Sequence, residues 1–252
     1  MKYWRSFVVL FLFCFFGVGS LILGLIYIPL TGLFIKPEKR RPFYCNVVHN
    51  LWAFFTNLMQ VTGSINLNID KDTETSLKNT KGSVIVANHP SFIDIVLLIG
   101  LIPNSLCVVK KEVKKNPVMS NIVKSAYLIN DEDNELLKQE ATKALNHGFN
   151  VIIFPTGTRT VEGEDMKLHK GAVSLAMYAN APIVPIHISC DYKFLAKHQK
   201  ILDAGTKPVN YYLTLNETIN IDEYREPNLD DTKLRRRLNA IVKDRIKNID
   251  VI

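Results

Sequence analysis

The sequence of 252 residues has few cysteines, and none of them lies close to another. The four cysteines stand at positions 14, 45, 107 and 190, so no C-x-x-C pair is present. Zinc sites and disulfide frameworks need such pairs or many cysteines, so we expect neither, and a reducing compartment fits the composition. With 47% apolar and 22% charged residues, the chain is also neither disordered nor collagen-like.

Charged residues are absent from residues 6–35. This run is longer than the ~20 apolar residues that cross a bilayer, so we predict a membrane helix. A cleaved signal peptide is the alternative, but its apolar core is usually ~7–15 residues long, and no A-x-A site precedes the next charges. Basic residues flank the run on both sides, and Gly17, Gly19, Gly24 and Pro29 interrupt it, so a spanning and a re-entrant helix both stay open.

A second uncharged stretch covers residues 42–69. Its apolar residues recur at helical spacing, with Asn46, Asn50 and Asn57 on the opposite side. We predict a helix in the membrane interface; a core helix of the globular part is the alternative, because the polar side carries no Lys or Arg. We therefore divide the chain into an N-terminal two-helix membrane module, residues 1–62, and a globular domain, residues 63–252.

Short β-type runs alternate with helical ones in the globular part. The predicted strands are residues 65–69, 83–87, 106–109, 127–129, 151–154 and 183–188. The predicted helices are residues 92–99, 135–145, 172–179 and 234–246, and residues 71–81 are predicted to be a polar connection. Such alternation indicates an α/β fold with a mostly parallel sheet flanked by helices.

Polar side chains follow the predicted strand at residues 83–87. Asn88 and His89 end the strand, Ser91 is the predicted N-cap of the next helix, and Asp94 lies one turn into it. Reactive groups of open α/β sheets gather at such carboxyl strand ends. A carboxylate on one imidazole nitrogen fixes the tautomer and leaves the other nitrogen to take a proton from a hydroxyl. The spacing therefore allows a general-base pair, with a purely structural pair as the alternative, because one H-x4-D also occurs often by chance.

A second strand end, after residues 151–154, carries hydroxyls, a glycine and an arginine. These are Thr156, Gly157, Thr158 and Arg159. Backbone N–H groups released by a glycine turn and the planar guanidinium of the arginine suit a phosphate or carboxylate. A plain turn with a surface arginine is the alternative.

Three further features lie near these strands. Residues 181–187 read as a buried strand interrupted by Pro185, which we expect at a sheet edge or a bulge. His169 follows the arginine turn and is either an ordinary core or surface histidine or a residue at the border of the site. The lysines in residues 110–115 form either a solvated face or a docking surface for an acidic carrier protein or anionic lipid.

The three strand ends, in this order and spacing, resemble the glycerolipid acyltransferases typified by 1-acyl-glycerol-3-phosphate acyltransferase. The N-H-x4-D motif of that family is matched by Asn88, His89 and Asp94. Its F-P-E-G-T-R motif is matched by Phe154, Pro155, Gly157, Thr158 and Arg159, and its V-P-V motif by Val184, Pro185 and Ile186. The resemblance covers roughly residues 45–220 and extends to the two-helix membrane module.

The resemblance implies transfer of a fatty acyl group from a thioester, acyl-ACP or acyl-CoA, to a hydroxyl of a lysophospholipid-like membrane acceptor. It implies that His89 is the general base and that Asp94 orients it. The residues implied in substrate binding are Thr156, Gly157, Thr158, Arg159 and Lys110. The thioester is then a co-substrate, the expected partners are membrane lipids and the acyl carrier, and no cofactor or metal is needed.

Two departures from the family pattern bear on the acceptor. Thr156 stands where the family has Glu, which removes a carboxylate from this place. The strand predicted at residues 127–129 runs into Asp131, Glu132 and Asp133, where the family has a phosphate-binding arginine. Like charges there repel a phosphate dianion. The acceptor is therefore either a lysophosphatidate-like lipid or a lipid alcohol with a different head group.

Other classes of function fit parts of the sequence. A non-catalytic lipid-binding homologue keeps the fold, and a thioesterase uses water in place of the alcohol. DNA or RNA binding is disfavoured, because basic and acidic residues are interspersed and much of the net charge of +7 lies beside the apolar N-terminus. We expect a membrane protein with its active site on the cytoplasmic side, in a bacterial inner membrane.

Overall fold

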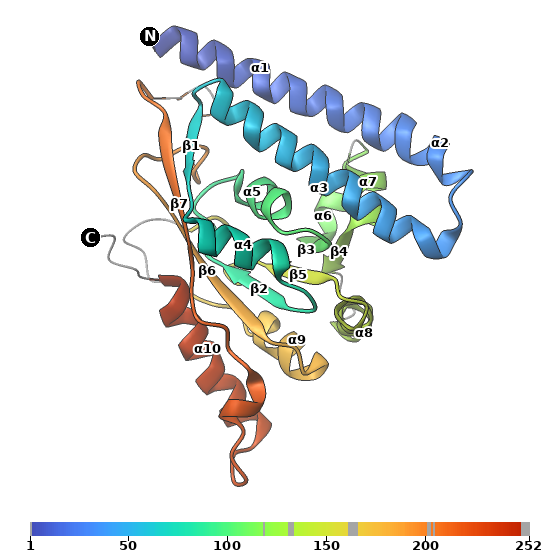
Figure 1. The fold of residues 1–252 in the computed structure, drawn as a ribbon, viewed down its shortest axis with the longest axis vertical. Coiled ribbons are helices and arrows are strands. Elements are labelled where there is room, and N and C mark those ends of the chain that lie inside the picture. The colour runs from blue at the N-terminus through green and yellow to red at the C-terminus, as the bar shows by residue number, and fades with distance from the viewer. Residues whose placement is uncertain are drawn as a thin grey trace.

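The computed structural model describes residues 2–117, 119–130, 134–160, 166–200, 203 and 205–247. Over these residues the strands are β1 (Ile65–Asn68), β2 (Val84–Ala87), β3 (Ser105–Lys110), β4 (Tyr127–Asn130), β5 (Asn150–Ile153), β6 (Ile183–Cys190) and β7 (Val209–Leu215). They form one sheet in the order β1-β7-β6-β2-β5-β3-β4 (Figure 1). Of the described strand pairings only that of β6 with β7 is antiparallel, so the predicted mostly parallel α/β sheet is confirmed.

Helices cover both faces of the sheet. The helices of the globular part are α4 (Lys71–Asn79), α5 (Asp94–Leu101), α6 (Lys111–Lys115), α7 (Ser120–Ala126), α8 (Asn134–Asn146), α9 (Gly171–Ala179) and α10 (Asp231–Lys247), with a 3₁₀ turn, η2, at Ile221–Tyr224. Helices α5 and α7 lie on one face, and α8, α9 and α10 lie on the other. The central strand β2 is consequently buried at every residue, which explains its uninterrupted apolar sequence.

The structure corrects three of the local predictions. Residues 71–81 are not a plain connection, because α4 occupies most of them and buries Leu77. Strand β7 is absent from the predicted set. Pro185 lies in β6, which is an interior strand and not an edge. Its missing N–H is tolerated because the pairing with β7 begins only at Ile186, while the Pro185 carbonyl accepts a hydrogen bond from the Asn216 N–H at 3.0 Å.

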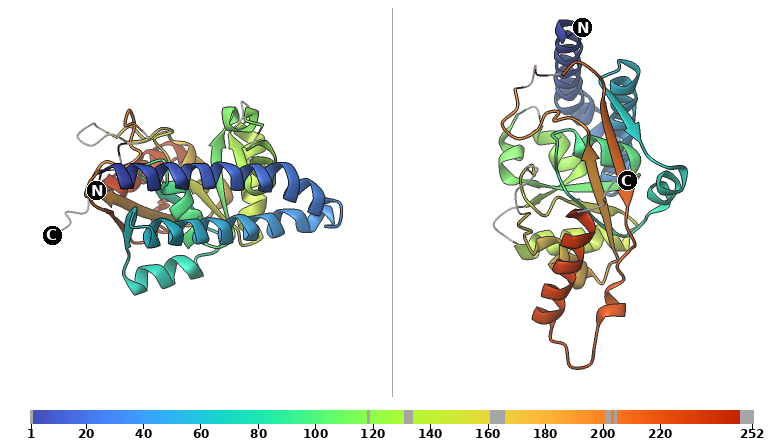
Figure 2. Two further views of the ribbon diagram at one scale, coloured as in Figure 1. Left: turned by 90° about the horizontal axis from the view of Figure 1, so that it is seen from above. Right: turned by 90° about the vertical axis from the view of Figure 1, so that its left-hand side faces the viewer.

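The N-terminal region is a helical hairpin. Its first arm comprises α1 (Lys2–Leu21), a π-helical stretch η1 (Ile22–Tyr27) and α2 (Ile28–Gly32), and its second arm is α3 (Pro37–Val61). The two arms run side by side across the globular part (Figures 1 and 2). Aromatic side chains join them, with the rings of Phe16 and Trp52 stacked at 5.0 Å.

Helix α3 docks on the α/β part. Its His49 Nδ1 lies 2.7 Å from the Ile99 carbonyl oxygen, and the Trp52 indole donates to the Tyr127 hydroxyl at 3.1 Å. Gly100 of α5 makes this close approach possible, since a Cβ there would meet the Ala53 backbone nitrogen at 2.8 Å. One face of α3 is therefore part of the protein core. This agrees with the alternative given above for residues 42–69, a core helix of the globular part. The division at residues 62 and 63 stays a prediction.

The outward face of the first arm of the hairpin is apolar. Residues Trp4–Gly32 form one helical segment long and apolar enough to cross a membrane, with 28% of its most apolar window buried in the protein. Large side chains on its outer face are exposed, among them Trp4 at 66% and Phe7 at 59%. On α3, Phe54 is 54% exposed. The first arm thus exposes an apolar surface, whereas the second arm also exposes polar residues such as Asn46, Asn50 and Asn57.

Candidate active site

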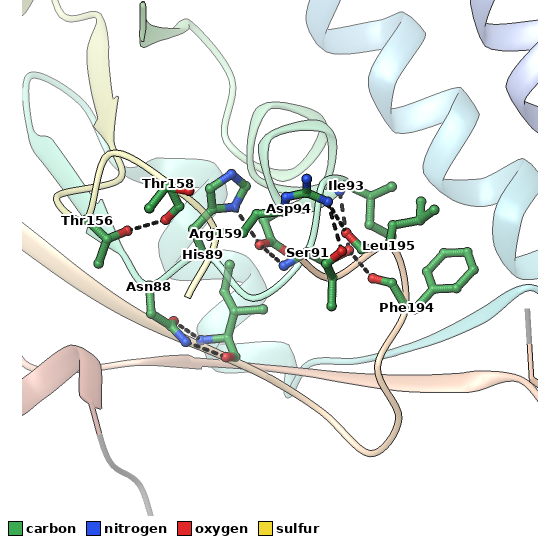
Figure 3. Close-up of polar contacts among 12 residues, drawn as sticks. Asn88, His89, Ser91, Ile93, Asp94, Thr156, Thr158, Arg159, Phe194 and Leu195 are labelled. Atoms are coloured by element: carbon green, nitrogen blue, oxygen red, sulfur yellow. Dashed lines mark hydrogen bonds and ion pairs between the residues drawn. The ribbon is translucent and has the colours of Figure 1, made fainter. Parts of the chain in front are cut away.

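The carboxyl ends of neighbouring parallel strands bring the predicted site residues together. Asn88 follows β2 and exchanges two hydrogen bonds of 2.7 Å with the backbone N–H and carbonyl of Ile188 on β6 (Figure 3). This amide clamp holds the end of β2 against its neighbour. The residue that follows, His89, is thereby placed at the edge of the sheet, next to the end of β5.

His89 and Asp94 form a hydrogen-bonded pair, as the sequence predicts. The imidazole Nδ1 lies 2.8 Å from Oδ2 of Asp94, which also accepts from the Ser91 N–H at 2.7 Å. Asp94 is the first residue of α5 and is fully buried, whereas 18% of the His89 side chain is exposed. With the carboxylate on Nδ1, the proton sits there and Nε2 keeps its lone pair for a substrate proton.

The carboxylate of the pair is shielded from water. Burial raises the pKa of the Asp94 carboxyl above its ordinary value, while the His89 hydrogen bond, the Ser91 N–H and the charge of Arg159 act in the opposite direction. Removing any of these partners leaves a buried charge with less compensation. The pair is therefore built into the core and not a chance surface contact.

Ser91 has a different role from the one predicted. Ile93 occupies the N-cap position of α5, and no side chain caps the helix there. The Ser91 hydroxyl donates instead to the Phe194 carbonyl at 2.6 Å, which ties the segment after His89 to the loop after β6. The helix also begins two residues later than predicted, at Asp94, because its first turn is organised around the carboxylate.

The imidazole is fixed by a second strand end. The ring of Phe154, which follows β5, stacks on the His89 ring with 4.3 Å between centroids and 25° between planes. The His89 carbonyl accepts from the Thr160 N–H at 2.7 Å. Phe154, which belongs to the second predicted motif, and Thr160, which directly follows that motif, thus add a second set of contacts to His89 beside those of Asp94.

The glycine turn closes on itself. Gly157 has a φ of +64°, which favours glycine, and the Thr156 hydroxyl donates to the Thr158 carbonyl at 2.7 Å. The His169 ring packs against the turn, since a Cβ on Gly157 would meet it at 3.4 Å. His169 therefore borders the site, the second of the two interpretations that the sequence leaves open for it.

Part of the Arg159 guanidinium is used in hydrogen bonds within the protein. Its Nη1 donates to the backbone carbonyls of Leu195 and Ala196, at 2.7 and 3.1 Å (Figure 3). Among the described residues, Nε and Nη2 bind no acceptor, so these two donors are the ones available for a substrate oxygen. The guanidinium also anchors the loop after β6, a role that sequence reasoning does not find.

Lys110 is the last residue of β3, and it is exposed. Because β3 is parallel to β5, this residue lies along the same sheet edge as the glycine turn. The acidic residues Asp131, Glu132 and Asp133, on which we based the predicted repulsion of phosphate, lie outside the described residues.

An apolar cavity with an empty volume of about 410 Å³ adjoins the pair. Its walls come from α1 and α3, from Phe92 and Ile93 between the two catalytic candidates, and from Phe194 and Leu195 of the loop after β6. All lining residues are apolar, and part of the space is open to solvent. The cavity suits an aliphatic chain. Sequence reasoning misses Phe194 and Leu195, because nothing in an irregular loop signals them.

Comparisons with known proteins agree with this geometry. A family model described as Acyltransferase matches residues 68–189. The chain is 31% identical over 140 residues to the 1-acyl-sn-glycerol-3-phosphate acyltransferase of Bacillus subtilis, covering 54% of this chain and 69% of that protein. It is 33% identical over 109 residues to the lyso-ornithine lipid O-acyltransferase of Pseudomonas aeruginosa, covering 41% and 42% of the two chains. It spans about half the length of the plant relatives that it matches.

The crystal structure of the 1-acyl-sn-glycerophosphate acyltransferase of Thermotoga maritima has the same fold, with a TM-score of 0.71 at 19% identity over 97% of this chain and 95% of that one. The α/β fold and the named relatives together identify the class of protein as an O-acyltransferase. The chain belongs to the family of the 1-acyl-sn-glycerol-3-phosphate acyltransferases.

Proposed function

We propose that the protein transfers a fatty acyl group from a thioester, acyl-ACP or acyl-CoA, to a hydroxyl of a lysophospholipid-like membrane acceptor, with His89 as the general base. The observation that carries the proposal is the His89–Asp94 pair, 2.8 Å apart, next to an apolar cavity. A base whose Nε2 has no hydrogen-bond partner among the described residues can activate a hydroxyl, and the cavity accommodates an acyl chain beside it.

The reaction needs no enzyme nucleophile. His89 takes the proton of the acceptor hydroxyl through Nε2 while the oxygen forms a bond to the thioester carbonyl carbon. The tetrahedral intermediate then expels the thiolate, whose C–S bond breaks. The thiolate takes the proton from the imidazolium, which leaves an ester and a free thiol. Asp94 stabilises the imidazolium in between, and the stacked ring of Phe154 holds it in place.

The glycine turn supplies the acceptor site in this proposal. Nε and Nη2 of Arg159 and the N–H groups of the turn bind an anionic or polar head group. Lys110 at the same sheet edge adds positive charge for the acceptor or the acyl carrier.

A second candidate acceptor is a lipid alcohol without a glycerophosphate head group. The Thr156 hydroxyl, in place of the family's Glu, is engaged by the Thr158 carbonyl, and Nη1 of Arg159 is engaged by the loop after β6. The match to a protein named lyso-ornithine lipid O-acyltransferase supports this second candidate.

A direct assay tests the proposal. We expect the purified protein in lipid vesicles to form a new ester from a long-chain acyl-ACP or acyl-CoA and either lysophosphatidate or lyso-ornithine lipid, measured by mass spectrometry. Product with lysophosphatidate identifies the first acceptor, and product with lyso-ornithine lipid alone identifies the second. Release of free fatty acid without any ester would point to a thioesterase, and no turnover with any pair would point to a lipid-binding homologue.

We also propose that the protein is membrane-bound, with its active site on the cytoplasmic side of a bacterial inner membrane. Both arms of the hairpin pack on the domain along their inner sides, so we infer that they lie within one leaflet. The exposed aromatic residues of α1 support this placement, because moving Trp and Phe side chains from water into the membrane interface lowers the free energy.

If the hairpin lies within one leaflet, the exposed apolar residues of α1 should contribute measurably to the free energy of membrane binding. The double substitution Phe7→Ser and Phe11→Ser, at side chains that are 59% and 50% exposed, should weaken binding to anionic vesicles at least tenfold, since burial of each Phe contributes about 1.5–3 kcal/mol. Cosedimentation measures the effect. The matched control changes Leu136 and Tyr178 to Ser on α8 and α9, at similar exposures of 52% and 50%, and should bind as the wild type does. Unchanged binding of the first variant would contradict the placement and favour a spanning helix.

A further inference from the structure

Two apolar side chains of the loop after β6 are buried although they belong to no helix or strand. Within residues 191–200, only Phe194 and Leu195 are buried, at 3% and 6% exposure. Both line the apolar cavity beside the His89–Asp94 pair, and neither has a part in the mechanism described so far. The loop therefore supplies one wall of the cavity through these two residues.

Leu195 has a backbone conformation that its side chain does not favour. Its φ is +51°, in the left-handed region, where a bulky residue is uncommon. Residues in this region persist where the surrounding contacts hold them, and they are frequent at active sites and ligand clamps. The place of Leu195 in the cavity wall therefore depends on the contacts that hold its backbone.

Three hydrogen bonds from the catalytic region hold this part of the loop. The Leu195 carbonyl accepts from Nη1 of Arg159 at 2.7 Å and from the Phe92 N–H at 3.2 Å (Figure 3). The Ser91 hydroxyl donates to the Phe194 carbonyl at 2.6 Å. Arg159 belongs to the glycine turn, so the turn is joined directly to the wall of the cavity.

We propose that Leu195 is a specificity-determining residue for the acyl chain, and that Arg159 is the positioning residue that holds it at the cavity. The proposal rests on the proposed function, because it takes the cavity as the site of the thioester's acyl chain. Arg159 then acts on both substrates. Its Nη1 fixes the wall of the acyl cavity, while Nε and Nη2 remain for the head group of the acceptor.

The apolar chemistry of the wall explains how Leu195 selects a chain. Every residue that lines the cavity is apolar, so an acyl chain is discriminated there by the fit of its methylenes and not by hydrogen bonds. One methylene more or less in a hydrophobic pocket changes kcat/KM by about 10–200-fold. A change in the size of the Leu195 side chain should therefore change the preferred chain length.

Two substitutions of opposite size test the role of Leu195. Dodecanoyl and octadecanoyl thioesters of one carrier compete for a single acceptor lipid, and mass spectrometry gives the ratio of the two esters. We expect this ratio to shift by about tenfold or more toward the longer chain in Leu195→Ala, which enlarges the cavity, and toward the shorter chain in Leu195→Trp. A ratio measured on one preparation does not depend on how much of the protein is folded.

Leu175→Ala is the matched control for the loss of a buried leucine. Leu175 lies in α9, is 4% exposed and is not among the residues that line the cavity. Its variant should keep the wild-type ratio of the two esters. The wild-type ratio in both Leu195 variants would overturn the proposal.

The substitution Arg159→Lys tests the positioning role in the same competition. Lysine keeps the positive charge but lacks the planar fork of donors that bonds the loop and leaves nitrogens for the acceptor. We expect the ratio of the two esters to move toward unity by about threefold or more, within the range for loss of one hydrogen bond, because a loosened wall discriminates less. An arginine that served the acceptor alone would lower both esters equally, and an unchanged ratio would refute the positioning role.

A measurement without turnover separates this proposal from the proposed function. Fatty acids of the same two lengths with a terminal diazirine are bound to the whole protein in nanodiscs, without thioester or acceptor, and the photolabel on residues 92–96 of the cavity wall is measured by mass spectrometry. A changed ratio of the two labels in Leu195→Ala supports the proposal even if the acceptor assays find no ester. An unchanged ratio, or no label on this segment, overturns it even if the wild type proves to be an active acyltransferase.

Discussion

Replacement of His89 by alanine should lower kcat/KM for acyl transfer by about a thousandfold while the protein stays folded and bound to membranes. General-base catalysis contributes about 10²–10⁴ to a rate, and the pair itself offers no second base, because its other member is the buried Asp94. The loss should fall on kcat more than on KM, because the cavity and the glycine turn are unaffected. Ester formation by the purified variant, followed by mass spectrometry, measures the effect.

His147→Ala is the matched control for this experiment. His147 is an exposed histidine at the end of α8, with its Nδ1 2.7 Å from the Lys143 carbonyl oxygen, and its loss should leave acyl transfer unchanged. Vesicle binding and the circular dichroism of both variants should equal those of the wild type. Acyl transfer by His89→Ala within tenfold of the wild type would rule out His89 as the base.

Gly100→Ala should destabilise the protein strongly, although it adds only one methyl group. The added Cβ would lie 2.8 Å from the Ala53 nitrogen and 3.0 Å from the Trp52 carbonyl carbon, both backbone atoms of α3 that cannot move aside as a flexible side chain could. Overpacking of this kind costs typically 1–3 kcal/mol, and we expect about 3 kcal/mol off the free energy of unfolding. Chemical denaturation measures it.

The contrast with a second glycine separates overpacking from helix propensity. Gly171 is the first residue of α9, and a Cβ added there would meet no atom of the described residues within 4 Å. Gly171→Ala should therefore be neutral or stabilise the protein by roughly 0.5–1 kcal/mol. A Gly100→Ala protein as stable as the wild type would mean that α3 is free to move away from α5.

Strand ends were the most predictable part of the site. His89, Asp94 and the turn at Gly157 were found from sequence because each follows a short apolar run, and such runs are strands in an α/β protein. The pairing of β2 with β5 brings the two motifs together, although β3 and β4 lie between these strands in the sequence. The contact between His89 and Phe154 was therefore beyond the sequence alone.

Features set by tertiary packing were missed for physical reasons. Helix α4 has polar residues nearly throughout and is anchored by Leu77, so it shows little of the periodicity that marks a helix. Strand β7 alternates buried and partly exposed residues between two turns, and its Tyr211 reads as an ordinary core aromatic. Ser91 is not the N-cap of α5, because the helix begins only at Asp94 and the Ser91 hydroxyl donates to the Phe194 carbonyl of a distant loop.

Helix α1 forms a wall of the apolar cavity through residues such as Val9 and Leu12, and it carries exposed apolar side chains such as Trp4 and Phe7 on its other side. A shortened protein lacking residues 2–21 would be easier to handle in water, but the apolar cavity would lose one of its walls. Chain-length preferences measured on such a protein would describe a different binding site. The N-terminal hairpin and the domain that carries His89 therefore belong together, and preparations in detergent or nanodiscs that retain the whole hairpin are the appropriate material for enzymology.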